Sequence, residues 1–385
     1  MPERQRIATA TLKTLSPLFI GSGEETDLSP YTDFIQDGRQ LVYLDERKFQ
    51  AFLSEKPELV DKYVSGIREG FENNRSTFSL AGFLASIPDM KRDNIERRRI
   101  AIDGEIKKNQ LRRFIATSGL PYVPGSTIKG AIRTAVLFDW IMNSGAGRKQ
   151  LQEIKALTEK RFRRDLQKTA VERNCFGSIS RDAFRFLRIS DSETAPPSAI
   201  CVSEIRHLSL YPSTTAKKNT AYRKAEIPQW NELLRPDVSM TFSISLEQPH
   251  ERTGLPFLDE QKLTGLFSII NSFSRESCLR ELDELEGRPH EFDRFSSFYE
   301  KLESQLGSLG ENEAILRLGG GKTWFDNSIG LALDSEEFGE ESLFGEYLNL
   351  LKIGHLPFPS TRSVTVSDGR PQLPLGWVKL SIIKK

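Results

Sequence analysis

Two basic side chains, Lys129 and Arg133, stand four residues apart directly after the turn-forming sequence Pro124-Gly125-Ser126-Thr127. The proline keeps the approach extended, and Gly125-Ser126 or Ser126-Thr127 offers a helix cap. Apolar residues at helical spacing then predict a helix to about residue 142. Because its N-terminus carries unpaired N–H groups and the positive end of the helix dipole, the segment suits a phosphate. A capped structural helix with two solvated cations is the alternative.

Two glycine-rich turns follow predicted strands and would let another chain approach the backbone closely. The first is Gly21-Ser22-Gly23, and the second is Gly319-Gly320-Gly321-Lys322-Thr323. The second is not a nucleotide-binding phosphate loop, because Leu316 occupies the position where that motif needs its first glycine. Lys322 then serves as a phosphate contact, or the segment is a flexible turn.

Catalytic and metal-binding patterns are scarce in this sequence. The four histidines, at positions 207, 250, 290 and 355, are scattered, and none has a nearby ligand set. Asp33 and Asp191 are expected to cap turns. Residues 211–224 mix cations with two tyrosines, which suits single-stranded nucleic acid, although a solvated loop explains them equally well. We therefore expect a binding protein with no catalytic residue, no metal and no cofactor.

Composition describes an ordinary soluble protein with a marked charge asymmetry. The net charge is +1, but residues 91–188 hold 23 Lys and Arg against 10 Asp and Glu, a net +13. Residues 280–346 hold 6 against 17, a net −11. A basic half of this kind suits a polyanionic partner. Three isolated cysteines and the lack of a long apolar run predict a cytoplasmic protein with reduced thiols and no membrane contact.

Strand and helix patterns mix along the chain without strict alternation, which predicts an α+β fold. The cleanest alternating strand, at 238–246, is taken to open a second unit, so the predicted domains are 1–235 and 236–385. Residues 73–108 have no clear period and read as a basic insertion. Strands are expected at 7–15, 184–189, 200–205, 314–318 and 377–383, a hairpin at 34–43, and helices at 45–52, 57–71, 149–173, 259–273, 291–306 and 337–351.

Four segments together resemble the RAMP proteins of CRISPR systems, and within them the Csm-type subunit that caps the 3′ end of the guide RNA in type III-A complexes. They are Leu15-Ser16-Pro17-Leu18-Phe19-Ile20-Gly21-Ser22-Gly23, residues 122–134, the glycine-rich 316–321, and the tail segments 359–362 and 374–380. This resemblance implies two ferredoxin-like (RRM/RAMP) domains with helical insertions, of a kind that can interleave their strands. Some related RAMPs cleave RNA with a histidine near the first strand, where this chain has Phe19.

The resemblance also implies a role. The chain would bind the 3′ portion of crRNA, contact the backbone RAMP subunit and the small helical subunit, and support crRNA maturation without catalysis. A RAMP-type endoribonuclease and a purely structural adaptor are the alternatives. The expected RNA-binding residues are Gly21, Ser22, Gly23, Ser126, Thr127, Lys129 and Arg133, extended by Lys322 and Arg362.

Overall fold

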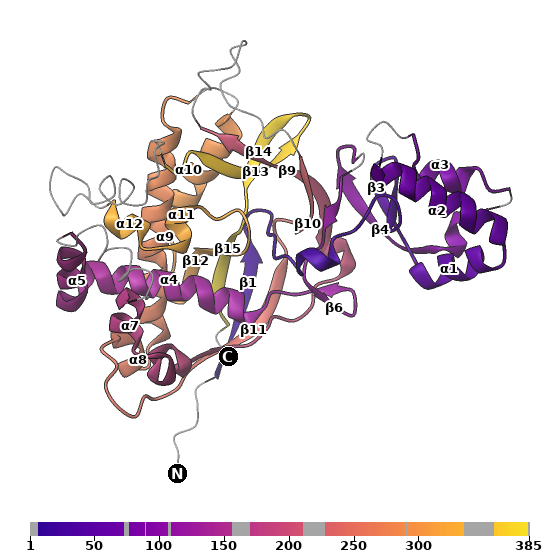
Figure 1. The fold of residues 1–385 in the computed structure, drawn as a ribbon. Coiled ribbons are helices and arrows are strands. Elements are labelled where there is room, and N and C mark those ends of the chain that lie inside the picture. The colour runs from indigo at the N-terminus through magenta and orange to yellow at the C-terminus, as the bar shows by residue number, and fades with distance from the viewer. Residues whose placement is uncertain are drawn as a thin grey trace.

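A computed structural model describes residues 7–72, 77–88, 90–106, 109–155, 170–210, 228–288, 292–334 and 358–383. Within these ranges the chain mixes helices with two large sheets, so the α+β prediction is confirmed. Figure 1 shows most of the helices gathered on one side of the sheets and a small lobe on the opposite side.

The first sheet has five strands, and each neighbouring pair is antiparallel. Side chains alternate on β1, where Ala10, Leu12 and Thr14 are buried on one face. In spatial order the strands are β12 (Glu313–Arg317), β15 (Trp377–Ile382), β1 (Ile7–Thr14), β11 (Ser239–Leu246) and β8 (Leu187–Ile189).

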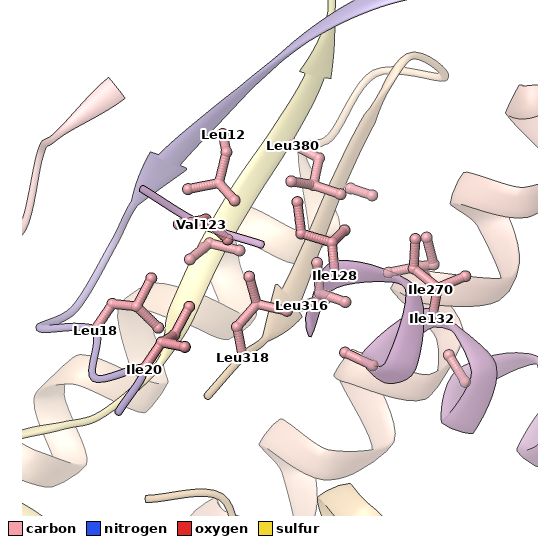
Figure 2. Packing of buried hydrophobic residues seen from close by; sticks show 14 of the residues in the cluster. Leu12, Leu18, Ile20, Val123, Ile128, Ile132, Ile270, Leu316, Leu318 and Leu380 are labelled. Atoms are coloured by element: carbon pink, nitrogen blue, oxygen red, sulfur yellow. The ribbon is translucent and has the colours of Figure 1, made fainter. Parts of the chain in front are cut away.

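Two long helices, α4 (Gly125–Asn143) and α9 (Leu263–Leu285), pack on this sheet and on each other. Figure 2 shows Leu12, Leu316 and Leu380 of the strands close to Ile128 and Ile132 of α4 and Ile270 of α9. All of these side chains are at most 2% exposed. The apolar stripe predicted for the helix after Pro124 is therefore the face of α4 that packs against the sheet.

The second sheet follows the order β14-β13-β9-β4-β3-β2, with β10 paired to β9 and β5 paired to β10. Its neighbours are antiparallel except for the pairs β4–β9 and β5–β10. The strands are β2 (Phe34–Asp37), β3 (Gln40–Leu44), β4 (Glu96–Asp103), β5 (Leu111–Arg112), β9 (Ile200–Ser209), β10 (Gln229–Leu234), β13 (Thr361–Ser367) and β14 (Arg370–Pro374).

Both sheets draw strands from both predicted domains. In the first sheet β1 lies between β11 and β15, and in the second β13 lies against β9. Backbone hydrogen bonds in both sheets therefore join the ranges 1–235 and 236–385, so strands of the two ranges alternate within the sheets. Alternation along one strand shows that it lies in a sheet, but it does not show which strand is its neighbour.

The small lobe in Figure 1 consists of β2, β3 and β4 with α1 (Glu46–Ser54), α2 (Pro57–Glu72) and α3 (Leu80–Ala85). Its helices enclose a separate apolar cluster around Phe49, Phe83 and Leu84. The opposite face of the same strands contributes Phe34, Tyr43 and others to the main core. Residues 73–108, which show no period, thus contain a helix and a central strand.

Several predicted boundaries shift in the structure. The helix expected at 259–273 begins at Leu263 and runs to Leu285, and β9 continues to Ser209. The helix predicted at 337–351 and the basic segment 211–224 lie outside the described residues. The remaining elements are α5 (Gly145–Lys155), α7 (Ala170–Phe176), α8 (Pro256–Asp259), α10 (Asp293–Gly307), α11 (Trp324–Asn327), α12 (Gly330–Leu333), β6 (Ala116–Thr117) and β7 (Leu120–Pro121).

Candidate nucleic-acid interface

A groove of about 380 Å³ lies where the two sheets meet. All four segments that carried the family resemblance contribute to it: Gly21 from the first, Thr127 from the second, Gly319–Gly321 from the third, and Ser363 with Leu375 from beside and within the tail segments. The other lining residues are Phe19, Ile20, Arg112, Ile205, His207, Gln229 and Asn231.

One wall of the groove is a face of the second sheet. Gln229 and Asn231 alternate along β10, so their side chains share a face. Gln229 stands opposite Ile205 of β9, and Ser363 of β13 stands opposite His207 of β9. Arg112 of β5 stands opposite Asn231. Residues directly opposite each other in a ladder point to the same side of the sheet. Strands β5, β9, β10 and β13 therefore contribute side chains to one wall of the groove.

The facing wall is built from tightly packed backbone. The amide of Gly320 donates a 2.8 Å hydrogen bond to the carbonyl of Phe19. Gly319 has φ +66°, and a Cβ there would lie 2.1 Å from the same carbonyl oxygen. Only glycine fits at this position, so the glycine-rich turn is required for close packing as well as for access to the groove.

The N-terminus of α4 is closed by a carboxylate from the chain itself. Pro124 is the N-cap residue, and no side chain from the predicted capping pairs caps the helix. Instead, the Gly125 amide donates a 2.8 Å hydrogen bond to Oδ1 of Asp191, which follows β8. The predicted cap is wrong, because the helix end packs so closely on this loop that a partner distant in sequence reaches it.

Two carboxylates and one aromatic ring hold the guanidinium of Arg133 in place. Its Nη1 lies 2.9 Å from Oδ2 of Asp182 and its Nη2 lies 3.3 Å from Oε2 of Glu172. The guanidinium carbon is 3.9 Å from the ring centroid of Phe176. These contacts tie α4 to α7 and the segment after it, so Arg133 has a structural role, and it does not line the groove.

Lys129 is half-buried, with its ammonium 5.8 Å from the ring centroid of Phe184. Burial and the nearby charges of Arg133 and Arg188 lower the pKa of Lys129, and Asp182 partly offsets them. Thr127, two residues earlier in α4, lines the groove, whereas Lys129 is not among the lining residues.

The first glycine-rich turn reaches the groove only through Gly21. The hydroxyl of Ser22 is hydrogen-bonded to that of Thr26, and Gly23, at φ +111°, precedes a short turn. Ser126 is exposed at the start of α4. Ser22, Gly23 and Ser126 are therefore neighbours of the groove in sequence and are not among its lining residues.

Arg362 is placed differently from the prediction. Its side chain is 1% exposed, its Nε donates a 2.7 Å hydrogen bond to Oε2 of Glu281, and its Nη1 donates to the carbonyl of Pro359. A guanidinium in this buried ion pair is not available to RNA phosphate, so we remove Arg362 from the candidate site. Because β13 alternates, Ser363 reaches the groove in its place.

Lys322 follows Gly321 and is half-buried. Burial lowers its pKa, the nearby Asp326 raises it and Arg317 lowers it, with a net decrease. Lys322 is not among the residues that line the groove.

The lining residues missed from the sequence include the polar side chains of Arg112, His207, Gln229 and Asn231. The guanidinium carbon of Arg112 lies 5.3 Å from the ring centroid of Phe19, and Nδ1 of His207 lies 2.9 Å from the hydroxyl of Ser363. The polar alternation of Gln229-Trp230-Asn231 was the available signal. It gave no indication of which strands would join β10.

The described part of the chain contains no metal-binding cluster, no disulfide and no membrane-spanning helix. No group of three or more His, Cys, Asp or Glu side chains gathers there at a spacing that could hold a metal ion. The three cysteines form no disulfide, and burial raises the pKa of the Cys278 thiol to about 12. None of the described helices combines the length and apolar character needed to cross a membrane.

Comparisons with known proteins agree with the motif resemblance. The model of the RAMP superfamily matches residues 11–325. A curated Csm5 protein of a CRISPR system from Methanocaldococcus jannaschii is 29% identical over 96% of this chain and 88% of its own length. A Csm5 protein from Streptococcus thermophilus is 30% identical over 36% of this chain and 40% of its own length.

Two solved structures share the fold over nearly the whole chain. One is a chain in the cryo-EM structure of a type III-A Csm-crRNA-target RNA ternary complex, with a TM-score of 0.68 and 23% identity, covering 98% of this chain and all of that one. The other is the crystal structure of Csm5 from T. onnurineus, with a TM-score of 0.63 and 21% identity, covering 96% and 99%.

With a family model matching most of its length, this chain belongs to the RAMP superfamily. Within the superfamily, a Csm5 protein is similar to this chain along nearly its whole length, and the fold is shared with another Csm5 protein and with a chain of a type III-A Csm complex. The resemblance to the Csm-type RAMP subunit is thereby confirmed.

Proposed function

We propose that this chain is a non-catalytic RNA-binding subunit of a type III-A CRISPR (Csm) interference complex, and that it binds and caps the 3′ end of crRNA. One observation carries the proposal: a single groove joins residues from all four segments that resemble the family, with Arg112 beside them. The matching Csm5 proteins and the Csm-crRNA-target RNA complex support it.

Contacts in the groove would position RNA chiefly through its backbone. Glycine turns leave room for the phosphodiester chain, and Arg112 supplies a cation at the wall. Gly21 and Thr127 remain in the proposed site. The residues that do not line the groove are Ser22, Gly23, Ser126, Lys129 and Lys322. Arg112 takes the role that the sequence had suggested for Arg133 and Arg362.

The wider proposal concerns assembly. The chain would contact the backbone RAMP subunit and the small helical subunit, support crRNA maturation, and act in the cytoplasm in antiviral defence. We further propose that the two interleaved sheets correspond to two ferredoxin-like domains. The mixed strand order of both sheets supports interleaving.

The test is charge reversal at the groove. In the reconstituted complex, Arg112→Glu is expected to weaken crRNA retention about tenfold or more, because a repulsive carboxylate replaces a phosphate contact. The salt dependence of RNA binding by the purified chain should fall by roughly 0.7 in slope for each lost single-strand contact. Lys48→Glu, exposed on α1 in the lobe, is the matched control and should leave both measurements unchanged.

Two outcomes would replace the proposal. Unchanged retention and an unchanged salt slope in Arg112→Glu would favour the structural adaptor. A second candidate, metal-independent RNA cleavage, is favoured by one observation: His207 is exposed and lines the groove beside Ser363. Cleavage of repeat RNA by the purified chain, lost in His207→Ala, would establish that candidate.

A further inference from the structure

Asn231 lines the groove, and its carboxamide oxygen has no hydrogen-bond partner among the described residues. The residue is 2% exposed, and no donor among the described residues reaches its carboxamide oxygen, Oδ1. Buried polar atoms in folded proteins are almost always hydrogen-bonded, and an unmade bond costs free energy. A ligand that brings a donor to this oxygen would recover that cost.

The chemistry of the orphaned atom restricts the ligand. An amide oxygen accepts hydrogen bonds, and so do phosphate oxygens, so the phosphodiester group of RNA cannot satisfy it. Apart from the hydroxyls at its two ends, which DNA shares, RNA carries two kinds of donor, the ribose 2′-hydroxyl and the N–H groups of the bases. The base donors differ in position from one base to the next, whereas every ribonucleotide carries the 2′-hydroxyl. A guide strand must bind whatever its sequence, so the 2′-hydroxyl is the matching donor.

Neighbouring residues are consistent with a sugar at this place. Arg112 stands opposite Asn231 in the β5–β10 ladder and lines the same groove, so the wall that carries Asn231 also carries a cation for the adjoining phosphate. Ile205 provides an apolar surface on the same wall, and it is 3% exposed.

We propose that the groove holds the ribose of one guide nucleotide, with its 2′-hydroxyl donating to Oδ1 of Asn231, and that the chain thereby selects RNA over DNA. The proposal rests on the proposed RNA-binding function and adds to it the group that is recognised. Phosphate contacts alone would bind both nucleic acids.

The experiment compares the full-length chain with its Asn231→Leu variant, a substitution of similar shape. The probes are oligouridine and oligodeoxyuridine of equal length. The wild type should bind the RNA about tenfold more tightly, the worth of one well-made hydrogen bond. Asn231→Leu should bind both probes as the wild type binds the DNA. Its melting temperature should be equal or higher, because the buried carboxamide oxygen that it removes has no partner among the described residues.

A matched control comes from a buried polar side chain of the same sheet that does have partners. The Thr365 hydroxyl on β13 accepts a 3.3 Å hydrogen bond from the Leu373 amide and is 3.4 Å from the Leu373 carbonyl. Thr365→Val should lower the melting temperature and keep the RNA preference. If Asn231 were only structural, Asn231→Leu would also lower the melting temperature and keep the RNA preference. The two measurements therefore distinguish a structural role from recognition of the 2′-hydroxyl.

The inference fails if Asn231→Leu keeps the wild-type preference for RNA, or if the preference follows the base in oligocytidine against oligouridine. Should the variant not fold, wild-type binding to 2′-O-methyl oligouridine decides, because methylation removes the donor. If 2′-O-methyl oligouridine binds as weakly as oligodeoxyuridine, the inference is supported. If it binds as tightly as oligouridine, the inference is overturned. Loss of sugar discrimination with RNA binding intact leaves the proposed function standing, whereas no binding to any probe overturns both.

Discussion

Arg317 is a fully buried cation whose contacts shape one wall of the groove. Its Nη1 lies 2.8 Å from Oδ2 of Asp326, its Nε donates to the carbonyl of Leu375, and its Nη2 donates to that of Gly321. Ser277 adds a 2.6 Å hydrogen bond to Oδ1 of Asp326. The ion pair therefore fixes the glycine-rich turn against the segment that leads into β15.

We predict that Asp326→Asn lowers the free energy of unfolding at neutral pH by about 3–5 kcal/mol, because Arg317 loses its counter-charge in a buried site. Urea denaturation would measure the loss. Glu260→Gln, which breaks the exposed pair with Lys262, is the control and should change stability by less than about 1 kcal/mol.

The same pair predicts a pH dependence. Burial alone would raise the pKa of Asp326, but Arg317 and the hydrogen bonds from Ser277 and Thr323 outweigh it and lower that pKa. The stabilisation is therefore present above the ordinary carboxyl pKa of about 3.9 and is lost as the pH falls through the lower folded value. The stability gap between wild type and Asp326→Asn should narrow on acidification. A constant gap would contradict the assignment.

At the scale of elements, the entrance of α4 is defined by the space available to its first residue. A Cβ at Gly125 would lie 2.4 Å from the carbonyl oxygen of Ile189. The helix end can approach β8 closely enough to accept the Asp191 cap only because this residue is glycine. Thr127 is thereby brought to the groove.

We predict that Gly125→Ala destabilises the chain by about 1–3 kcal/mol, because backbone must move to admit the methyl group. Gly130, in the same helix, is exposed and has open space where a Cβ would be. Gly130→Ala should instead stabilise by up to about 1 kcal/mol through helix propensity. Thermal unfolding of both variants tests the pair, and equal effects would refute the packing argument.

At the scale of the whole molecule, the helices of the lobe and the residues of the groove belong to different apolar clusters. Phe83 of α3 packs in the lobe, with its ring centroid 5.0 Å from that of Tyr63. The groove residues Phe19 and Ile205 belong to the main core. Glu232 joins the two parts, since its carboxylate receives hydrogen bonds from Tyr43, Arg98 and the Phe114 amide.

We predict that Phe83→Ala costs the lobe about 3–5 kcal/mol and speeds amide hydrogen exchange in β2 and β3, while the affinity for RNA stays the same. The matched control is Phe267→Ala in α9, a buried phenylalanine of the main core, which should speed exchange in the first sheet. A loss of RNA affinity in Phe83→Ala would show that the lobe takes part in binding.

The sequence by itself determined most local elements of this protein. Alternating apolar residues predicted β1 and β11, and an apolar stripe predicted α4, because strands and helices impose their periods on neighbouring residues. Asp45 predicted the start of α1, where its side chain caps the helix. The motifs also indicated the superfamily and pointed to two glycine-rich turns.

Tertiary structure decided which residues meet. Arg112, Asn231 and His207 come from β5, β10 and β9, whose pairing no local pattern encodes, and only that pairing makes them one wall. Burial likewise decided that Arg362 serves an ion pair and that Asp191 occupies the helix end which the sequence had suggested for phosphate. Residue type sets what a side chain can bind, but the partner it has depends on contacts between distant segments.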